Sequence, residues 1–437
     1  LCRTWLRNAG SSPIGGTFGG QETWNVQTCD VFLKFHLSCS PRTWVVPSFS
    51  VRRVYLDNNA TTRVDPLVLE AVLPHFLEDF GNASSIHEYG QKARASIEEA
   101  RRHVARLIGA EPKEVVFTSG GTESDNTAIR GVCGFHRSRG NHIVTTTVEH
   151  PAILRSCEQL ESEGFRVTYV PVDRDGLIQM EQLREAVDDQ TILISVMHAN
   201  NEIGTIQPVE EISQIARERE VVFHTDAVQS VGKIPLEVGR LGVGLLSLSG
   251  HKLHAPKGVG ALYVRQGVSM DALLHGGSHE RNRRGGTENV PGVVGLGKAC
   301  ELGQLGLDDF DLRVRKLRDK LEAGIIEAVP DTIVNGSVSS RMPHVSNISF
   351  QGIEGEALLI SLDLQGIAVS TGAACASGSL EPSHVLRAMK ISSSRVDSAI
   401  RFSLSRMNSD EDIDYALKVV PETVERMREL SPLYREG

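Results

Sequence analysis

Residues 221–252 read VVFHTDAVQSVGKIPLEVGRLGVGLLSLSGHK and contain two short apolar runs. The first run, residues 221–223, leads into His224-Thr225-Asp226, and the second, residues 245–248, leads into Ser249-Gly250-His251-Lys252. Short apolar runs with polar boundaries are typical of strands that are buried on both faces of a sheet. The stretch therefore predicts two successive strands that lead into polar, potentially reactive side chains.

Similar apolar runs recur upstream, and the stretches between them are long enough for helices. In residues 89–107, apolar side chains recur at intervals of three and four residues, which places them on one face of a helix. The alternation of strands and helices predicts an α/β fold with a mostly parallel sheet that is covered on both faces. The further expected strands cover residues 115–117, 143–145, 167–172 and 192–197, and the further helices cover residues 153–163, 180–186 and 209–218.

The pattern changes after about residue 300, where helices dominate. The expected elements are helices around Leu317, Leu321 and Ile325, over residues 355–364 and from Ser409 with Asp412 as a capping partner, and strands over residues 344–350 and 367–370. We expect a large α/β domain over residues 51–300 and a smaller α+β domain over residues 301–437. Residues from about 51 could also pack with the smaller domain, and residues 293–307 could continue a helix across the boundary.

The composition excludes several classes of protein. The 437 residues include 46 Lys and Arg against 55 Asp and Glu, a net charge of −9, which argues against a strongly basic nucleic-acid-binding protein. No apolar run approaches the ~18 residues of a membrane-spanning helix. The seven cysteines form no C-x-x-C pair, which argues against a disulfide framework and a zinc site. We expect a soluble cytoplasmic protein without nucleic-acid or membrane partners.

The first fifty residues differ from the rest. They contain all three tryptophans and three of the seven cysteines, but only two acids, Glu22 and Asp30. Residues 1–50 are therefore expected to form a presequence-like or disordered extension, with an extra structured element as the alternative. If the extension is a transit peptide, the protein is mitochondrial rather than cytoplasmic.

Polar residues that suit a ligand site follow several expected strands. Ligands of open parallel sheets bind beyond the carboxyl ends of the strands. Residues 118–124, TSGGTES, place two glycines before a helix start, where free N–H groups favour a phosphate, although a Gly-Gly pair is also typical of a simple turn. The next strands lead to Glu149-His150 and to residues 198–202, HANNE.

One cofactor needs all of these groups. Pyridoxal phosphate (PLP) requires a lysine for a Schiff base, a carboxylate for its ring nitrogen, a ring to stack on and a cradle for its phosphate. Asp226 and Lys252, which follow successive strands, suit that arrangement. Taken singly, each residue has a simpler explanation: an N-cap aspartate, a surface lysine or a histidine with satisfied hydrogen bonds.

Several motifs in order resemble those of a known family. Residues 249–252 (SGHK), 55–62 (YLDNNATT) and 224–229 (HTDAVQ) are similar to segments of the NifS/IscS-type cysteine desulfurases. These are fold-type-I PLP enzymes of the class-V aminotransferase family, and the likeness is closest to the NifS branch. It runs from about residue 54 to about residue 433 and includes residues 276–289 and 400–406.

The resemblance implies how the cofactor ring would be held. Lys252 would form the Schiff base, Asp226 would pair with the ring nitrogen, and Gln229 would hydrogen-bond the ring hydroxyl. His150 would stack on the ring and move protons.

The resemblance also implies contacts to the phosphate and the substrate. The phosphate would be held by Gly121, Thr122, Ser249 and His251, and by Thr287 of the other subunit, which makes the protein a homodimer. Arg401 would bind the substrate carboxylate through its planar guanidinium. Asn200 would contact the cofactor and assist Arg401, and Asn58 would line the site.

Cys375 lies in a run of small residues, 369–378, which predicts a flexible loop; a buried structural thiol is the alternative. The resemblance implies that this cysteine attacks the sulfur of the bound L-cysteine, leaving alanine and an enzyme persulfide. Its proton needs a base, for which His150 is a candidate. Thr371 and Ala373 depart from the commonest family pattern, and Ala-Ala-Cys also occurs in selenocysteine lyases, so the choice between sulfur and selenium stays open. Residues 381–387 agree with the NifS/IscS group.

The sequence thus predicts a homodimeric, PLP-dependent cysteine desulfurase that delivers sulfur to an iron–sulfur scaffold or another acceptor. The rivals are a selenocysteine lyase, an aminotransferase or lyase without persulfide chemistry, and a non-catalytic scaffold, against which the intact set of reactive residues argues. No metal is expected, since His275, His279 and Glu280 form only a weak pattern. Cys133, Cys157 and Cys300 are predicted to be core residues.

Overall fold

The computed structural model describes residues 52–371, 382–432 and 434. These described residues belong to one compact unit. Residues 1–50 lie outside the described residues, so the expected extension stays a prediction. Within the described ranges, no helix is long and apolar enough to cross a membrane.

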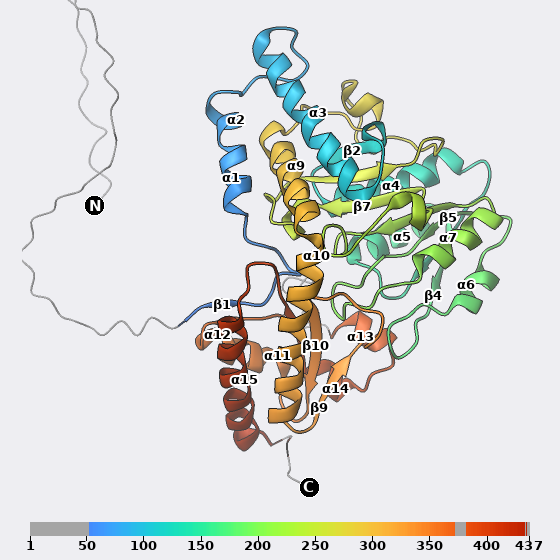
Figure 1. Ribbon diagram of the computed structural model, residues 1–437. Coiled ribbons are helices and arrows are strands. Elements are labelled where there is room, and N and C mark those ends of the chain that lie inside the picture. Colours follow the sequence, from blue (N-terminus) through green and yellow to red (C-terminus); the bar gives the residue numbers. More distant parts are fainter. Residues whose placement is uncertain (1–51, 372–381, 433, 435–437) are drawn as a thin grey trace, which may run out of the picture. The chain divides into compact units, whose positions relative to one another are not determined.

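A seven-stranded sheet forms the centre of this unit (Figure 1). Its strand order is β2-β8-β7-β6-β5-β3-β4. All neighbours from β7 to β4 run parallel, whereas β8 is antiparallel to both β7 and β2. The strands are β2 (Val115–Thr118), β3 (His142–Thr146), β4 (Arg166–Val170), β5 (Thr191–Ser195), β6 (Val222–Asp226), β7 (Leu245–Ser249) and β8 (Gly260–Val264). The predicted α/β fold with a mostly parallel sheet is confirmed.

Two strands differ from the sequence prediction. β8 is not among the predicted strands, although its five residues form an apolar run as clear as the others. β6 continues to Asp226 instead of ending at residue 223. Its polar residues can lie inside the sheet because they find partners there: His224 Nδ1 is 2.9 Å from Ser195 Oγ, and Thr225 Oγ1 donates to the backbone oxygen of Val196 over 2.8 Å.

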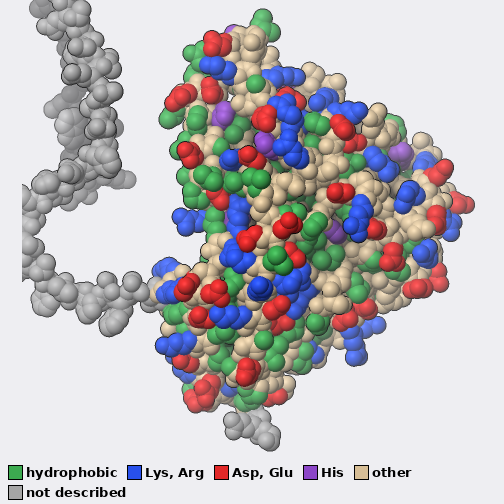
Figure 2. Space-filling model, viewed as in Figure 1, with side chains coloured by type: hydrophobic (Ala, Val, Ile, Leu, Met, Phe, Trp, Pro, Cys, Tyr) green, Lys and Arg blue, Asp and Glu red, His purple; other side chains and the backbone are tan. Residues whose placement is uncertain are grey.

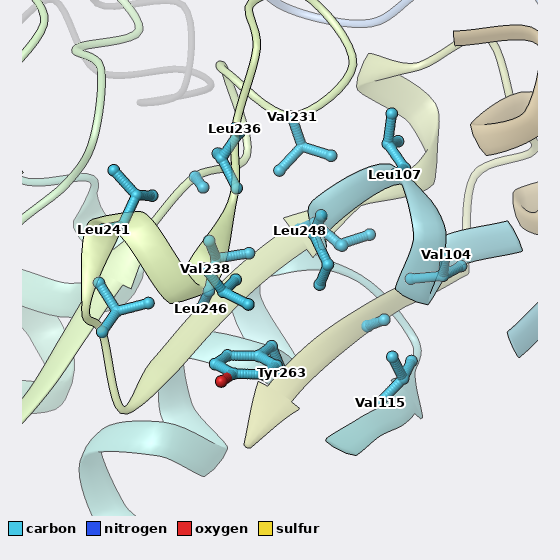
Figure 3. Packing of buried hydrophobic residues seen from close by; sticks show 14 of the residues in the cluster. Val104, Leu107, Val115, Val231, Leu236, Val238, Leu241, Leu246, Leu248 and Tyr263 are labelled. Carbon is cyan, nitrogen blue, oxygen red and sulfur yellow. The ribbon is translucent and has the colours of Figure 1, made fainter. Parts of the chain in front are cut away.

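Helices cover both faces of the sheet, as predicted. On one face, α3 (Glu88–Ile108) packs along α9 (Val290–Leu305), and this layer buries strand residues such as Leu246 and Leu248 (Figure 3). On the opposite face, α4 (Gly121–His136) and α5 (Pro151–Ser162) cover Leu193 and Leu245. Because side chains alternate along a strand, each strand contributes to both apolar layers. The other helices of this half are α1 (Pro66–Val72), α2 (Pro74–Leu77), α6 (Met180–Ala186), α7 (Val209–Glu218) and α8 (Val238–Leu241), with short turns at Pro112–Glu114, Gly250–Lys252 and His279–Asn282.

A second apolar core forms around a three-stranded antiparallel sheet of order β12-β10-β9. The predicted helices are present, and Ser409 and Asp412 form the predicted capping box at the start of α15. The elements of this half are β9 (Thr332–Asn335), β10 (Val345–Phe350), β12 (Ala399–Ser403), α10 (Leu307–Asp309), the π-helix Phe310–Val314, α11 (Arg315–Ala328), α12 (Gly355–Leu364), α13 (His384–Ala388), α14 (Ser393–Asp397) and α15 (Asp410–Leu430).

The first described strand pairs with the C-terminal part of the chain. β1 (Val54–Tyr55) runs parallel to β11 (Ile367–Ala368), and both contribute to the second core. The expected boundary near residue 300 falls inside α9, so the division into two domains stays a prediction. The consequence for the site is that residues 56–62 leave β1 and run toward the ends of β6 and β7.

Candidate active site

Asp226 and Lys252 come together at the carboxyl edge of the central sheet. Asp226 is the last residue of β6, and Lys252 lies in the turn that follows the parallel neighbour β7. The Asp226 side chain is buried, and its Oδ1 accepts a hydrogen bond from Val228 N over 2.9 Å. Burial raises the pKa of Asp226 to about 6, while the Val228 N–H and the charge of Lys252 act in the opposite direction. A cationic ring nitrogen would therefore be a favourable partner for this carboxylate.

The segment that follows β1 covers Lys252. The Lys252 amine donates to the backbone oxygens of Asn59 and, over 2.8 Å, of Ala60. Thr62 fixes this segment, since its backbone N and its Oγ1 each lie 2.9 Å from the backbone oxygen of His251. The lysine side chain is thus buried and held by carbonyl groups.

Gln229 and a lysine missed in the sequence analysis lie beside this pair. Gln229 Nε2 donates to the Asn59 backbone oxygen over 3.2 Å, and its Oε1 accepts from Lys233 Nζ over 3.2 Å. Burial, followed by the charges of Lys252 and Arg401, lowers the pKa of Lys233 to about 7. The signal for Lys233 was its spacing of four residues after Gln229, which alone does not separate a buried lysine from a surface one.

His150 caps α5 at the same edge of the sheet. Its Nδ1 accepts a hydrogen bond from Ala152 N over 3.1 Å. Burial, followed by the charges of Lys252 and His384, lowers the pKa of His150 to about 4, so the ring is neutral. With Nδ1 as the acceptor, the neutral ring carries its proton on Nε2. His150 is therefore a flat, neutral ring that suits stacking, and it can take up a proton at Nδ1 only after releasing the cap.

The glycine-rich turn between β2 and α4 has the features of an anion cradle. α4 begins at Gly121 and runs for 16 residues. A Cβ on Gly121 would lie 2.9 Å from Val228 Cγ2, so any larger residue at this position would require the Val228 side chain to shift. Within the described residues, the Thr122 and Ser249 hydroxyls have no hydrogen-bond partner, and His251 Nδ1 is 3.2 Å from Thr61 Oγ1. Helix N–H groups and unpaired hydroxyls are the donors that a phosphate needs, so the site fits the phosphate of PLP.

Arg401 on β12 brings a buried cation to the site from the second core. Its side chain is 1% exposed, with NH2 2.8 Å from Asp57 Oδ1 and NH1 2.9 Å from the Asn201 backbone oxygen. Its buried Nε has no partner among the described residues. The guanidinium thus keeps unused capacity for a carboxylate.

The side chains of the two asparagines proposed for substrate contacts already make hydrogen bonds to other parts of the chain. Asn200 is fully buried, with its Oδ1 accepting from Glu202 N and Ile203 N and its Nδ2 donating to Val148 O over 3.0 Å. Asn58 Nδ2 donates to Ser403 O over 2.9 Å.

The neighbouring Asn201 makes no side-chain hydrogen bond within the described part of the chain, while its backbone oxygen receives Arg401. Asn201 is therefore better placed than Asn200 to reach a ligand. The Asn-Asn pair was visible in the sequence, but which of the two side chains the fold uses for its own hydrogen bonds depends on the turn.

Comparison with known proteins agrees with this arrangement. Residues 54–416 match the family model of the class-V aminotransferases. A cysteine desulfurase IscS from Methanosarcina thermophila is 52% identical over 382 residues, covering 87% of this chain and 94% of the relative. This chain belongs to the class-V aminotransferases, among the IscS/NifS-like cysteine desulfurases. A cysteine desulfurase of Gluconacetobacter diazotrophicus is 52% identical over 383 residues, covering 87% of this chain and 96% of the relative.

Solved structures extend the likeness to the fold. A NifS-like protein superposes with a TM-score of 0.81 at 41% identity, covering 86% of this chain and all of the other. A structure described as SspA in complex with cysteine gives 0.73 at 36% identity, covering 82% and 100%. These likenesses confirm the fold-type-I architecture, and enzymes of the class-V aminotransferase family depend on PLP.

The catalytic cysteine expected for a cysteine desulfurase, Cys375, lies outside the described residues. The residues that flank its segment are held next to the site. Ser370 and Arg401 exchange backbone hydrogen bonds. On the other flank, Ser383 Oγ donates to Glu202 Oε2 over 2.5 Å, and His384 Nε2 is 2.9 Å from the Glu149 backbone oxygen.

The other cysteines among the described residues are buried, as predicted. Cys133, Cys157 and Cys300 are free thiols in the apolar layers. Burial raises the pKa of Cys133 and of Cys300 to about 12, so these thiols are poor nucleophiles. In the described part of the chain, no group of three His, Cys, Asp or Glu residues could hold a metal ion, and Glu280 is bound by Arg101.

Proposed function

We propose that this protein is a homodimeric, PLP-dependent cysteine desulfurase that converts L-cysteine to L-alanine and carries the sulfur as a persulfide on Cys375. The observation that carries the proposal is the convergence of a buried amine and a buried carboxylate, Lys252 and Asp226, beside the hydroxyls of Thr122 and Ser249, which have no hydrogen-bond partner among the described residues. When bound, PLP supplies an electron sink that labilises bonds at the substrate α-carbon.

The residues at the sheet edge each have a task in holding PLP. Asp226 keeps the ring nitrogen protonated, and the buried Lys252 provides the amine for covalent attachment. His150 offers a neutral ring face, with its cap bond fixing the ring orientation. Gln229, held at both ends by Asn59 and Lys233, presents its amide to the ring hydroxyl. Gly121, Thr122, Ser249 and His251 receive the phosphate.

Arg401 selects an amino acid by its carboxylate. In the structure its guanidinium is turned to Asp57 and the Asn201 backbone, and its Nε has no partner in the part of the chain that the structure describes. A substrate carboxylate would complete the hydrogen bonds of this buried cation, which is a strong, geometry-specific interaction. Asn201, rather than Asn200, would support the substrate from the same side.

The sulfur step needs a mobile thiol and a base. After a base has taken the proton of the Cys375 thiol, the thiolate attacks the substrate sulfur and an S–S bond forms as the C–S bond breaks. The electron pair of the broken bond stays with the carbon skeleton, which takes up a proton and becomes alanine. The described residues on either side of the Cys375 segment are held at the site, Ser370 by backbone hydrogen bonds to Arg401 and His384 by its contact with the Glu149 backbone oxygen. The persulfide then passes to an iron–sulfur scaffold or another acceptor in the reducing cytoplasm.

An exposed apolar surface supports the homodimer. Hydrophobic side chains lie along the edge formed by α1 and α2 (Figure 2). An exposed patch of this kind marks a protein–protein contact. The residues are Leu67, Leu69, Leu73, Phe76, Leu77 and Phe80, which are 51–78% exposed. Thr287 is also exposed, as a residue that serves a partner subunit has to be.

Borohydride reduction tests the cofactor assignment. The purified protein should lose its PLP absorption band on reduction and carry the cofactor covalently on Lys252, while Lys252→Ala should show no fixed cofactor. Fixation on another lysine would refute the assignment.

Turnover assays test the substrate and the persulfide. Alanine release from L-cysteine should exceed or equal that from L-selenocysteine. A strong preference for L-selenocysteine would identify the protein as a selenocysteine lyase instead. Cys375→Ser should keep the cofactor and lose sulfur transfer, whereas an aminotransferase would survive this change.

A further inference from the structure

Three consecutive residues before Thr287 have a left-handed backbone. Glu280, Arg281 and Asn282 have φ values of 46°, 57° and 64°. Residues other than glycine avoid this region because Cβ approaches the following carbonyl oxygen, and they adopt it singly rather than in runs. Such a run persists only where the surrounding structure over-determines it.

A buried ion pair holds this turn. The Glu280 carboxylate receives Arg101 NH1 over 2.7 Å and NH2 over 2.8 Å, and both side chains are 4% exposed. Phe117 N also donates to Glu280 Oε2 over 2.9 Å, and Arg101 NH1 donates to Val115 O over 2.9 Å. The turn is therefore fixed to α3 and β2 through a two-pronged contact that allows one orientation.

A second contact fixes the chain after the turn. Arg284 Nε donates over 2.9 Å to Glu123 Oε1, and the other oxygen of Glu123 accepts from Ser119 N. Gly285 N donates to Leu274 O over 2.9 Å, so residues 274–285 form a loop whose two ends are hydrogen-bonded to each other. The chain then leads to the exposed Thr287, which makes no contact with the proposed site of its own subunit among the hydrogen bonds of the described residues.

We infer that Arg101 and Glu280 form a positioning pair, which holds the left-handed turn and so presents Thr287 to the cofactor phosphate in the partner subunit. The inference rests on the proposed function, because it needs PLP and a dimer. Without the pair the turn relaxes toward an ordinary backbone conformation, and Thr287 moves with it. Neither residue is among those proposed to hold the cofactor.

The first test compares Glu280→Gln with Glu98→Gln. Glu98 is the matched control because it also bonds Arg101, at Nε over 3.2 Å, but lies outside the two-pronged contact. Each dimer is titrated with PLP and reduced with borohydride, and cofactor fixed on Lys252 is quantified by mass spectrometry. If Glu280→Gln displaces Thr287, the charged cofactor phosphate loses one hydrogen bond, which predicts an increase in the PLP dissociation constant of about tenfold or more. Glu98→Gln should raise this constant less than about twofold. Equal effects would overturn the inference.

Mixed dimers separate positioning in the partner from a general structural role. With Lys252→Ala in one subunit and Glu280→Gln in the other, the remaining Lys252 receives Thr287 from a subunit with an intact pair, so PLP binds as in the wild type. With both changes in one subunit, the remaining Lys252 receives the displaced Thr287, and PLP binds about tenfold more weakly. The reverse pattern, or equal affinities, would overturn the inference.

Two further measurements keep the outcomes distinct. If Glu280→Gln does not fold, Arg101→Lys takes its place in the mixed dimers. This variant retains the charge but loses the two-pronged contact, so it should give the same pattern of PLP affinities. If the wild-type dimer takes up no reducible PLP, the proposed function itself fails. If it does and the mixed dimers behave alike, only the positioning role fails.

Discussion

Glu149 offers a direct test of the electrostatics beneath the site. The residue precedes His150 and is fully buried. Its carboxyl accepts hydrogen bonds from Met197 N over 3.0 Å and from Thr146 Oγ1 over 2.7 Å. Burial, with a further contribution from the charge of Asp226, raises the pKa of Glu149 from 4.5 to about 8, against the opposing effect of these two donors. At neutral pH the folded protein therefore holds this carboxyl in its protonated form.

The sign and size of the effect follow from proton linkage. The unfolded chain loses this proton near pH 4.5, whereas the folded protein keeps it until about pH 8. The group's contribution to stability is present below pH 4.5 and is lost as the pH rises toward 8, at about 1.4 kcal/mol per pH unit. Between pH 5.5 and 7.5 the loss amounts to about 3 kcal/mol. Glu149→Gln stays neutral and keeps an acceptor for both donors, so it should not show this loss.

Urea unfolding of the apoprotein measures the difference. The free energy of unfolding of Glu149→Gln minus that of the wild type should rise by about 3 kcal/mol from pH 5.5 to 7.5. Glu181→Gln, an exposed position on α6, is the control and should leave the difference constant. A difference for Glu149→Gln that does not change with pH would refute a protonated Glu149.

Three further sets of variants test the site. Arg401→Lys should raise the KM for L-cysteine at least about tenfold, because an ammonium cannot replace the planar guanidinium; an unchanged KM in steady-state kinetics would contradict the assignment. Asn200→Ala should lower the free energy of unfolding by about 1–3 kcal/mol because it leaves buried backbone groups unpaired, whereas Asn201→Ala should keep stability in the same urea assay and weaken substrate binding. Gly121→Ala should weaken PLP binding in equilibrium dialysis, and Val228→Ala in the same chain should restore it by removing the 2.9 Å clash.

Elements with a local signal were predicted well from the sequence. The run 245–248 became β7, residues 355–364 became α12 with the same bounds, and Ser409 with Asp412 began α15. Each of these depends on periodicity or capping within a few residues. The extension of β6 to Asp226 was missed because its polar residues are satisfied by neighbouring strands, which a local pattern does not contain.

The same distinction applies to the site. Asp226 and Lys252 could be paired from the sequence because parallel strands end at one edge of their sheet, so order along the chain translates into nearness. The sequence does not reveal which asparagine of the pair at 200 and 201 makes hydrogen bonds within the fold. Nor does it reveal that Lys233 is buried against Gln229, or that Glu280 forms an ion pair with Arg101. These outcomes depend on contacts between residues far apart in the chain and on the direction of single side chains. Folding sets both, because a buried polar group has to find its partner wherever the packed elements leave one.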